Sequence, residues 1–236
     1  MKCYKKEELS DLKFVVAIDG TASSGKSTTA KLLAKKLGFT HLDTGAMYRA
    51  ITYLLIKNQA VEADDKLLQK LLFDAPLIFS IDNNKLSVYL DKQLLSDELR
   101  SPEVDSWVSP VAQRAFVRAF LLAKQRQLGA NQKLVCEGRD IGSVIFPDAE
   151  LKVYMKCGIE ERAKRRHREL LQKGIAKSLQ DVLTNLKRRD EIDSTREIAP
   201  LVQVEDAFVV DTTNLTIEQQ VEIIEAEVLK RMRSLS

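Results

Sequence analysis

Residues 13–38 constrain the fold of this chain more than any other stretch. The run KFVVAID at 13–19 is almost wholly apolar and is followed by Gly20, which opens the segment GTASSGKST. An apolar run of this kind is typical of a strand buried on both faces of a parallel sheet. Beyond the segment, apolar residues recur at the spacing of one helical face: Ala30, Leu33, Ala34 and Leu37. The sequence therefore predicts a strand, a tight loop and a helix that ends near Gly38.

The loop between this strand and helix matches the pattern G-x-x-x-x-G-K-[ST]. Its glycines allow successive backbone N–H groups to point at phosphate oxygens, and the following helix adds the positive end of its dipole. Lys26 can reach the β- and γ-phosphates of ATP, and the hydroxyl of Ser27 can bind Mg²⁺, which we expect as the cofactor. A polar surface turn without a ligand is the competing interpretation. The expected ATP site is Gly20, Thr21, Ala22, Ser23, Ser24, Gly25, Lys26, Ser27 and Thr28.

The rest of the chain alternates between strand and helix patterns. Further strands are expected at 39–43, 134–137, 151–155 and 208–211, and helices at 46–56, 64–73, 110–128, 160–173, 179–189 and 216–232. The last helix is expected to have Asn214 or Thr216 as its N-cap. Residues 77–81 and 86–90 flank a turn sequence and favour a β-hairpin, which indicates an inserted subdomain. The alternation predicts an α/β fold of three layers with a mainly parallel sheet.

Composition excludes several classes of protein. The 236 residues carry a formal net charge of only +3, with both signs interspersed, so we expect neither a nucleic-acid nor a membrane partner. No apolar stretch approaches the roughly 20 residues that a membrane helix needs. Cys3, Cys136 and Cys157 have no disulfide or metal spacing, which is typical of reduced thiols in the cytoplasm. Residues 1–13 lack the apolar segment of a signal peptide and are expected to form an N-terminal extension. Nothing in the sequence requires more than a monomer.

Charged residues also follow the expected strands. Arg49 stands near the start of the helix after 39–43, and Arg139 and Asp140 come directly after 134–137. Because ligands of an open parallel sheet bind beyond the carboxyl ends of its strands, these side chains are expected to face the same cleft as Lys26. An arginine fork there suits bidentate contact with a phosphate. A surface arginine and a structural ion pair are the alternatives.

The charged helices carry two further arginine clusters. If the helix continues far enough, Arg189, Asp193 and Arg196 share one face of it. Another cluster lies one helix earlier: Arg162, Arg165 and Arg166. A charged helical face is more often merely solvated, but arginines gathered between two core strands favour a lid that closes over phosphates.

Proteins with this loop include nucleotide switches, motor-type ATPases and kinases. GTP-binding switches recognise guanine through an Asn-Lys-x-Asp segment, and the nearest approximation, NKLS at 84–87, lacks the aspartate. Motor-type ATPases have an apolar strand that ends in acidic residues, which LVCE at 134–137 matches in part. A switch is therefore disfavoured, whereas an ATPase stays open on this strand alone.

Several motifs, taken together, resemble those of the bacterial-type cytidylate (CMP) kinases, a family of P-loop nucleoside monophosphate kinases. The resemblance runs from about Phe14 to Met232. Its motifs occur in the family order: GTASSGKST at 20–28, LDTGAMYR at 42–49, SDELRSPEV at 96–104, EGRDIGSVIFPDA at 137–149 and RRDEIDSTREIAPL at 188–201. Thr44 stands where serine is frequent and Glu137 where aspartate is frequent, and both keep the functional group. The first dozen residues have no counterpart.

The resemblance implies a division of the chain into a core at 14–63, 110–158 and 197–236, an inserted substrate-binding subdomain at about 64–109, and a lid at about 159–196. It implies that lid arginines, Arg162 and Arg166, act on ATP together with Lys26. It also implies that the acceptor phosphate is held by Arg49, Arg139 and Arg189, the cytosine by Ser109, Arg118 and Asp140, and the ribose region by Asp193 and Arg196, with Thr44 and Tyr48 lining the same pocket.

The activity that the resemblance implies is transfer of the γ-phosphoryl of ATP to CMP or dCMP. The exocyclic amino group of cytosine can donate to Asp140. Uracil would place a carbonyl oxygen against this carboxylate, and the buried acceptor without a donor would cost about 1–3 kcal/mol. Three alternatives stay open on the sequence. They are a kinase of another monophosphate, a kinase of a small hydroxyl substrate with Asp43 or Asp140 as base, and an ATP-binding regulator that transfers nothing.

Overall fold

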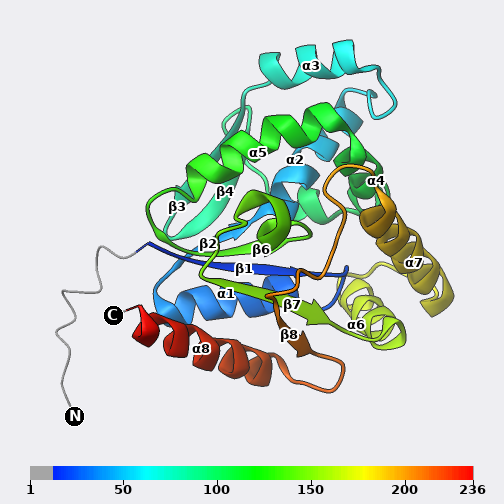
Figure 1. The fold of residues 1–236 in the computed structure, drawn as a ribbon. Helices are drawn as coiled ribbons and strands as arrows, with labels where there is room; N and C mark the ends of the chain where they lie inside the picture. The colour runs from blue at the N-terminus through cyan, green and yellow to red at the C-terminus, as the bar shows by residue number, and fades with distance from the viewer. Residues whose placement is uncertain (1–12, 236) are drawn as a thin grey trace.

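A computed structural model describes residues 13–235, so the expectations for Cys3 and for residues 1–12 lie outside the described chain. Within it, seven strands follow the order β3-β4-β2-β6-β1-β7-β8, and β5 pairs with β4 (Figure 1). The strands are β1 (Phe14–Gly20), β2 (Thr40–Asp43), β3 (Leu77–Asp82), β4 (Lys85–Leu90), β5 (Gln93–Leu94), β6 (Lys133–Gly138), β7 (Leu151–Lys156) and β8 (Phe208–Asp211). From β4 to β8 every neighbouring pair is parallel.

Strand β1 lies in the centre of the sheet and is buried along its whole length. Its side chains alternate between two cores: Val15 and Ala17 point into one, and Phe14, Val16 and Ile18 point into the other. The continuous apolar run at 13–19 therefore serves both faces, as expected of a central parallel strand.

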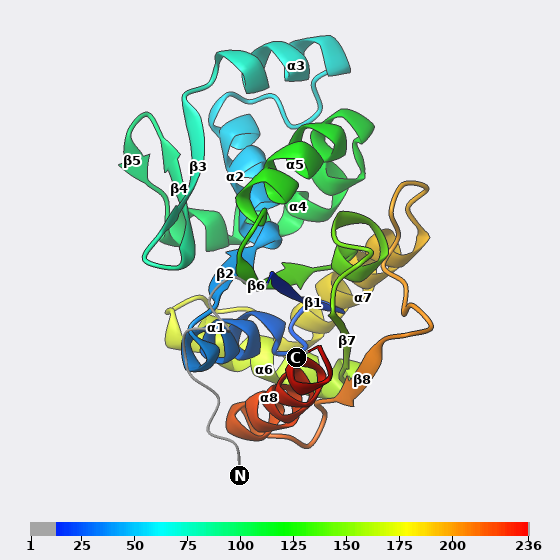
Figure 2. The ribbon, with the colours of Figure 1, turned by 60° about the vertical axis from the view of Figure 1, so that its left-hand side comes forward.

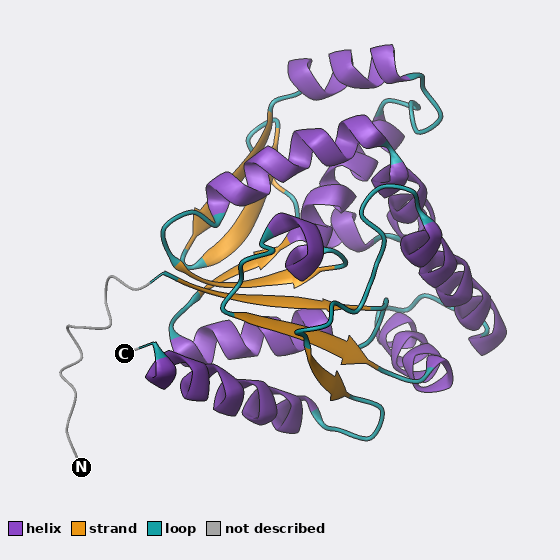
Figure 3. Ribbon diagram, in the orientation of Figure 1, coloured by secondary structure: helices purple, strands orange, loops and turns teal. Residues whose placement is uncertain are grey.

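Helices cover both faces of the sheet and complete three layers (Figure 3). Helices α1 (Lys26–Leu37) and α8 (Ile217–Ser234) pack on one face, while α2 (Thr44–Lys57) and α5 (Ala115–Leu128) pack on the other. The remaining helices are α3 (Asp65–Asp74), α4 (Pro102–Gln113), α6 (Ile159–Gln172), α7 (Leu179–Thr195), the 3₁₀ helix η1 (Asp97–Arg100) and the π-helical turn η2 (Ile141–Ile145). Gly38 caps α1 with φ 70°, and Thr216 caps α8 through a capping box, as expected. The helices on both faces of a mainly parallel sheet confirm the α/β fold of three layers.

The hairpin of β3 and β4 is confirmed, and it extends the central sheet. Asn83 and Asn84 form its turn with φ of 52° and 58°. Strand β4 pairs in parallel with β2 where His41 meets Lys85, so the hairpin lies at the sheet edge. Together with α3 it stands at the end of the molecule remote from α8 (Figure 2). Whether this region is a separate subdomain stays an interpretation.

The single helix expected at 110–128 is wrong. The chain forms α4 and α5, separated at Arg114, where φ is −68° and ψ is 121°. Helix α4 begins earlier because Ser101 and Pro102 make a strong helix start: the Ser101 hydroxyl accepts from the backbone N–H of Val104 at 3.3 Å. The expected domain boundary between residues 109 and 110 consequently falls within α4.

Helices α6 and α7 form a pair with a small core of its own. Leu170 of α6 packs with Val182 and Leu186 of α7, and Ala22 of the glycine-rich loop joins this core. The pair thus lies against the loop in this structure. Helix α7 continues to Thr195, well beyond the expected end at residue 189.

No helix in residues 13–235 is long and apolar enough to cross a membrane. Cys136 is buried and Cys157 partly buried, and both are free thiols.

Candidate functional site

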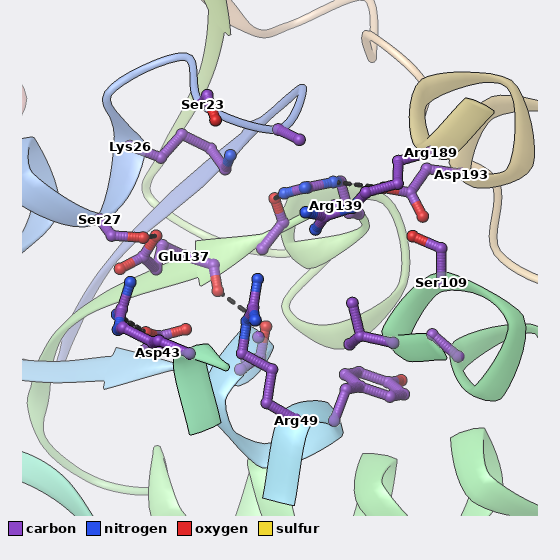
Figure 4. A pocket seen from close by; sticks show the side chains of 18 of the residues that line it. Ser23, Lys26, Ser27, Asp43, Arg49, Ser109, Glu137, Arg139, Arg189 and Asp193 are labelled. Carbon is purple, nitrogen blue, oxygen red and sulfur yellow. Dashed lines mark hydrogen bonds and ion pairs between the residues drawn. The ribbon is translucent and has the colours of Figure 1, made fainter. Parts of the chain in front are cut away.

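A cleft opens at the carboxyl ends of β1, β2 and β6, where the glycine-rich loop faces α2, α4 and the α6–α7 pair (Figure 4). This is the edge at which an open parallel sheet binds its ligands. Polar and charged side chains dominate its wall, which consists of Ala22, Ser23, Gly25, Lys26, Ser27, Thr28, Asp43, Thr44, Gly45, Tyr48, Arg49, Arg100, Val108, Ser109, Ala112, Glu137, Gly138, Arg139, Asp140, Arg166, Glu169, Arg189, Asp193 and Arg196.

The glycine-rich loop owes its shape to two of its glycines. Gly25 has φ 96°, a conformation that side chains rarely adopt, and a Cβ there would lie 2.9 Å from the side-chain oxygen of Gln220. A Cβ on Gly20 would lie 2.3 Å from the carbonyl oxygen of Met155. The loop is also tied to the segment after β8, because the Thr212 hydroxyl donates to the Ser24 carbonyl at 2.9 Å. These contacts hold the start of α1 against the cleft.

Lys26 is buried at the first position of α1 and extends along the loop. Its ammonium group donates to the carbonyl of Thr21 at 2.8 Å. Burial, with the nearby charge of Arg139, lowers the pKa of Lys26 to about 7. An anionic ligand in the cleft would raise the pKa of Lys26 again and so favour its charged form.

Ser27, Glu137 and His41 form a hydrogen-bonded chain beside Lys26. The Ser27 hydroxyl donates to Glu137 Oε2 at 2.6 Å, and His41 Nε2 lies 3.0 Å from Glu137 Oε1. Burial raises the pKa of Glu137, but the hydrogen bond from His41 and the charge of Lys26 outweigh it and bring the pKa below its usual value. Burial and the neighbouring Glu137 raise the pKa of Asp43.

These oxygens are of the kind that Mg²⁺ prefers, namely a hydroxyl beside carboxylates. No group of three or more acidic, histidine or cysteine residues in the described chain could hold a metal by itself. Mg²⁺ in phosphate-transfer sites commonly takes only one or two protein ligands and completes its shell with phosphates and water. Ser27 and Glu137 fit such a site.

Asp140 lies at the far end of the cleft between two arginines. Arg118 Nη2 donates to Asp140 Oδ2, and Arg196 Nη2 donates to Asp140 Oδ1 at 3.2 Å. The Arg118 guanidinium also lies 5.6 Å from the centre of the Tyr48 ring. Burial raises the pKa of Asp140, and the two arginines only partly offset it. Burial likewise raises the pKa of Tyr48 to about 12, so its hydroxyl stays protonated.

The middle of the cleft is rich in arginine. Arg139 Nε donates to Asp193 Oδ2 at 2.7 Å, which fixes this guanidinium in the cleft wall (Figure 4). Burial opposes ionisation of Asp193, but Arg139 outweighs it and lowers the pKa. Burial, with the nearby Arg49, lowers the pKa of Arg189 to about 10. The site therefore gathers guanidinium groups closely enough to perturb one another, an arrangement that suits a multiply charged anion.

Comparison with known proteins agrees with this geometry. The model of the cytidylate kinase family matches residues 16–230. The chain belongs to the cytidylate kinase family. A cytidylate kinase of Parabacteroides distasonis is 47% identical over 213 residues, which cover 88% of this chain and 93% of that protein. One from Clostridioides difficile is 44% identical over 214 residues, or 91% of this chain and 97% of that protein.

A solved structure of an uncharacterized protein from Eubacterium ventriosum shares the fold. It is similar with a TM-score of 0.50 at 11% identity, over 93% of this chain and 99% of that one.

Most residues that the resemblance to the cytidylate kinases singled out meet in the cleft. Those that line it are Ala22, Ser23, Gly25, Lys26, Ser27, Thr28, Thr44, Tyr48, Arg49, Ser109, Arg139, Asp140, Arg166, Arg189, Asp193 and Arg196. Arg118 stands behind Asp140, and Ser24 is buried within the loop. Arg196 follows the end of α7, so the expectation that it shares a helical face is wrong. Its Nε donates to the carbonyl of Ala199, and this bond directs it into the cleft from the following loop.

The lid arginines take different positions. Arg162 is buried beneath the loop, where its Nη1 donates to the Ala22 carbonyl at 3.1 Å and pairs with Asp190 at 2.6 Å. Arg166 lines the cleft. Arg165 points away from it, to the carbonyls of Thr212 and Thr213.

Sequence reasoning missed two residues that organise the site. His41 lies next to Glu137 and directly precedes the LDTGAMYR motif, but a histidine within an expected strand does not by itself indicate a site. Asp105, on α4, contacts Arg49, Arg166 and Arg189 together. It follows the SDELRSPEV motif directly, but a carboxylate in the first turns of a helix is too common to stand out.

Proposed function

We propose that this protein transfers the γ-phosphoryl group of ATP to CMP or dCMP, giving ADP and CDP or dCDP. The observation that carries the proposal is the cleft itself, which joins a phosphate-binding loop, an arginine cluster and a buried carboxylate in one continuous wall. In this proposal ATP binds at Lys26, and the monophosphate binds between Arg139 and Asp140. Membership of the cytidylate kinase family supports the same reaction.

The monophosphate is held at both ends. Arg49, Arg139 and Arg189 bind its phosphate, while Asp193 and Arg196 contact the ribose region. Asp140 accepts from the amino group of cytosine, and Arg118 and Ser109 donate to its ring acceptors. Thr44 and Tyr48 line the pocket between these groups.

The acceptor is already a good nucleophile. A phosphate monoester loses its second proton near pH 6, so an oxygen of CMP is ionised at neutral pH and needs no strong base. That oxygen attacks the γ-phosphorus, the new P–O bond forms, and the bond to the β-phosphate oxygen breaks. Catalysis then depends on alignment and on cations around the transferred group. Lys26, Arg139 and Arg189 supply positive charge along the path between donor and acceptor.

We further propose that Mg²⁺ accompanies ATP, held by Ser27 with Glu137 close by. When bound, it neutralises charge on the β- and γ-phosphates. Glu137 orients the Ser27 hydroxyl, and His41 in turn holds the Glu137 carboxylate.

The α6–α7 pair acts as the lid. Arg166 lies in the cleft wall beside Asp105, and Arg162 ties the pair to the loop backbone at Ala22. Closure excludes water and so suppresses wasteful hydrolysis of ATP. The division into core, inserted subdomain and lid stays a prediction, as do a monomeric state, a role in pyrimidine nucleotide metabolism and a cytoplasmic location.

The test is ADP production from ATP·Mg²⁺ with CMP, dCMP, UMP, AMP, GMP and dTMP in turn. We expect CMP and dCMP to stand well above the others. Preference for another base would contradict the pocket at Asp140 but leave the kinase reaction intact. Turnover that no monophosphate stimulates would overturn the proposal in favour of a regulator or of a kinase that acts on a small hydroxyl substrate.

A further inference from the structure

One carboxylate in the arginine cluster has no part in the reaction described above. Asp105 lies on α4 and is 8% exposed. Its Oδ1 is 2.7 Å from Nη1 of Arg49 and 3.6 Å from Nη1 of Arg189, and its Oδ2 contacts Nη2 of Arg166. Three arginines from three helices, α2, α6 and α7, thus converge on one side chain that does not itself line the cleft.

The cluster holds more positive than negative charge. Asp105 contributes one negative charge against three guanidinium groups, and among the described residues only Glu169 adds another contact, at 3.1 Å to Arg166. Glu169 is 55% exposed on its side chain, so its charge is screened by solvent. The Nε of Arg189 is buried without a hydrogen-bond partner in residues 13–235. A buried N–H group without a partner is unfavourable, so an acceptor atom of a bound anion would stabilise it.

Other carboxylates of the site are committed elsewhere. Asp193 pairs with Arg139, and Asp140 pairs with Arg118 and Arg196. Asp105 is therefore the anion that holds the phosphate-facing arginines together when no ligand is bound. Without it, like charges on Arg49, Arg166 and Arg189 would repel one another in a buried setting.

We propose that Asp105 is a built-in placeholder anion that competes with the acceptor phosphate for these arginines. That this phosphate belongs to CMP or dCMP rests on the proposed function, whereas the competition between Asp105 and a bound phosphate does not. When a monophosphate binds, its oxygens take over contacts from Asp105. The carboxylate stays nearby, and its repulsion weakens the hold of the site on the phosphate. Asp105 thereby limits the affinity for acceptor and product and favours release of the diphosphate.

The competition predicts that removing the charge of Asp105 tightens anion binding. We would measure binding of CMP, cytidine and inorganic phosphate to the full chain by calorimetry, without ATP, in wild type and in Asp105→Asn. Asparagine keeps the shape of the side chain and removes its charge. We expect CMP and phosphate to bind roughly 5- to 30-fold more tightly, as loss of one nearby like charge predicts. Cytidine, which has no phosphate, should bind as in wild type.

Two variants serve as controls. Asp105→Glu keeps the charge and should bind CMP like wild type. Asp65→Asn removes a charge from the ion pair that Asp65, 66% exposed on its side chain at the start of α3, makes with Arg114, and it should leave all three affinities unchanged. Because Asp105→Asn loses a buried counter-charge, it should unfold at a lower temperature, and added phosphate should raise its unfolding temperature more than that of wild type.

Weaker or unchanged binding of CMP and phosphate in folded Asp105→Asn would overturn the proposal, because a carboxylate that only positions the arginines helps binding. Tighter binding of cytidine as well would also overturn it, since the effect would then not lie at the phosphate. These measurements need no turnover. If wild type fails to phosphorylate CMP while Asp105→Asn still binds phosphate more tightly, the proposed function is wrong but the competition between Asp105 and bound phosphate is supported.

Discussion

Replacing Asp140 with asparagine tests how this site selects a base. The carboxylate lies between Arg118 and Arg196, whose side chains are 7% and 3% exposed. Asparagine has nearly the same shape, but its amide nitrogen donates where the carboxylate accepted. The amino group of cytosine then loses its acceptor, at a cost of about 1–3 kcal/mol, whereas the O4 carbonyl of uracil gains a donor. We therefore expect the ratio of kcat/KM for CMP over UMP to fall by roughly 5- to 150-fold.

The same substitution also destabilises the protein, and the assay has to separate the two effects. Loss of Asp140 leaves two buried guanidinium groups without their counter-charge, which costs about 3–5 kcal/mol. The ratio of kcat/KM for two substrates in one preparation does not depend on the fraction of enzyme that is folded. Measuring that ratio below the unfolding temperature therefore isolates selectivity, and the KM for ATP should stay near that of wild type.

A matched control is Asp206→Asn, which makes the same chemical change in an ion pair with Lys152, where Asp206 is 64% exposed on its side chain. It should leave both the ratio and the stability nearly unchanged. An Asp140→Asn variant that keeps the wild-type preference for CMP over UMP would refute the assignment of this carboxylate to the base. Equal losses for CMP and ATP would refute it too, because they would point to a general collapse of the cleft.

The other predictions concern the donor side and the fold. Lys26→Ala should lower kcat by about 10²–10³-fold, and near-wild-type turnover would contradict the role of the loop. The pKa of Lys26 is about 7 without ligand, so the amine is largely neutral at pH 8. ATP binding at pH 8 should therefore take up a proton, and the affinity for ATP should weaken as pH rises from 7. Calorimetry in buffers of different ionisation enthalpy should detect this proton uptake in wild type and its loss in Lys26→Ala. Glu137→Gln should raise the Mg²⁺ concentration for half-maximal activity by roughly tenfold with little change in KM for CMP, and an unaltered Mg²⁺ titration would exclude Glu137 from that site. Thr216→Ala removes the capping box of α8 and should lower the free energy of unfolding in urea by about 0.5–2 kcal/mol, whereas Thr216→Ser should retain most of it.

The parts of the fold that the sequence predicted correctly depend on local patterns. The apolar run at 13–19 is typical of a buried parallel strand, and the Gly-Lys pair at 25 and 26 after it identifies the phosphate-binding loop. Asn83 and Asn84 identify the hairpin turn because they tolerate positive φ. The cleft residues followed from strand ends: once β1 and β6 are parallel neighbours, the residues after each must meet at one edge.

What the sequence did not predict depends on distant contacts. The extended backbone at Arg114 separates α4 from α5, and α5 packs beside α2. The Arg114 side chain pairs with Asp65 of α3. Arg162 was expected over ATP, yet it lies under the loop because the carbonyl of Ala22 and the carboxylate of Asp190 hold it there. No spacing rule connects these partners, since each comes from a different element.

The two ends of the acceptor cleft differ in how their charges are balanced, and this difference divides selectivity from affinity. At the base end, Asp140 meets two arginines that are almost fully buried, so the group that selects the base is held rigidly before a ligand arrives. At the phosphate end, Asp105 is the one carboxylate among the described residues that contacts all three of Arg49, Arg166 and Arg189, and the Nε of Arg189 has no hydrogen-bond partner there. A phosphate therefore gains energy from charges that the protein leaves uncompensated, while the base gains little beyond its matched hydrogen bonds. Such a site should accept any monophosphate weakly, but retain in a productive position only the one whose base fits Asp140.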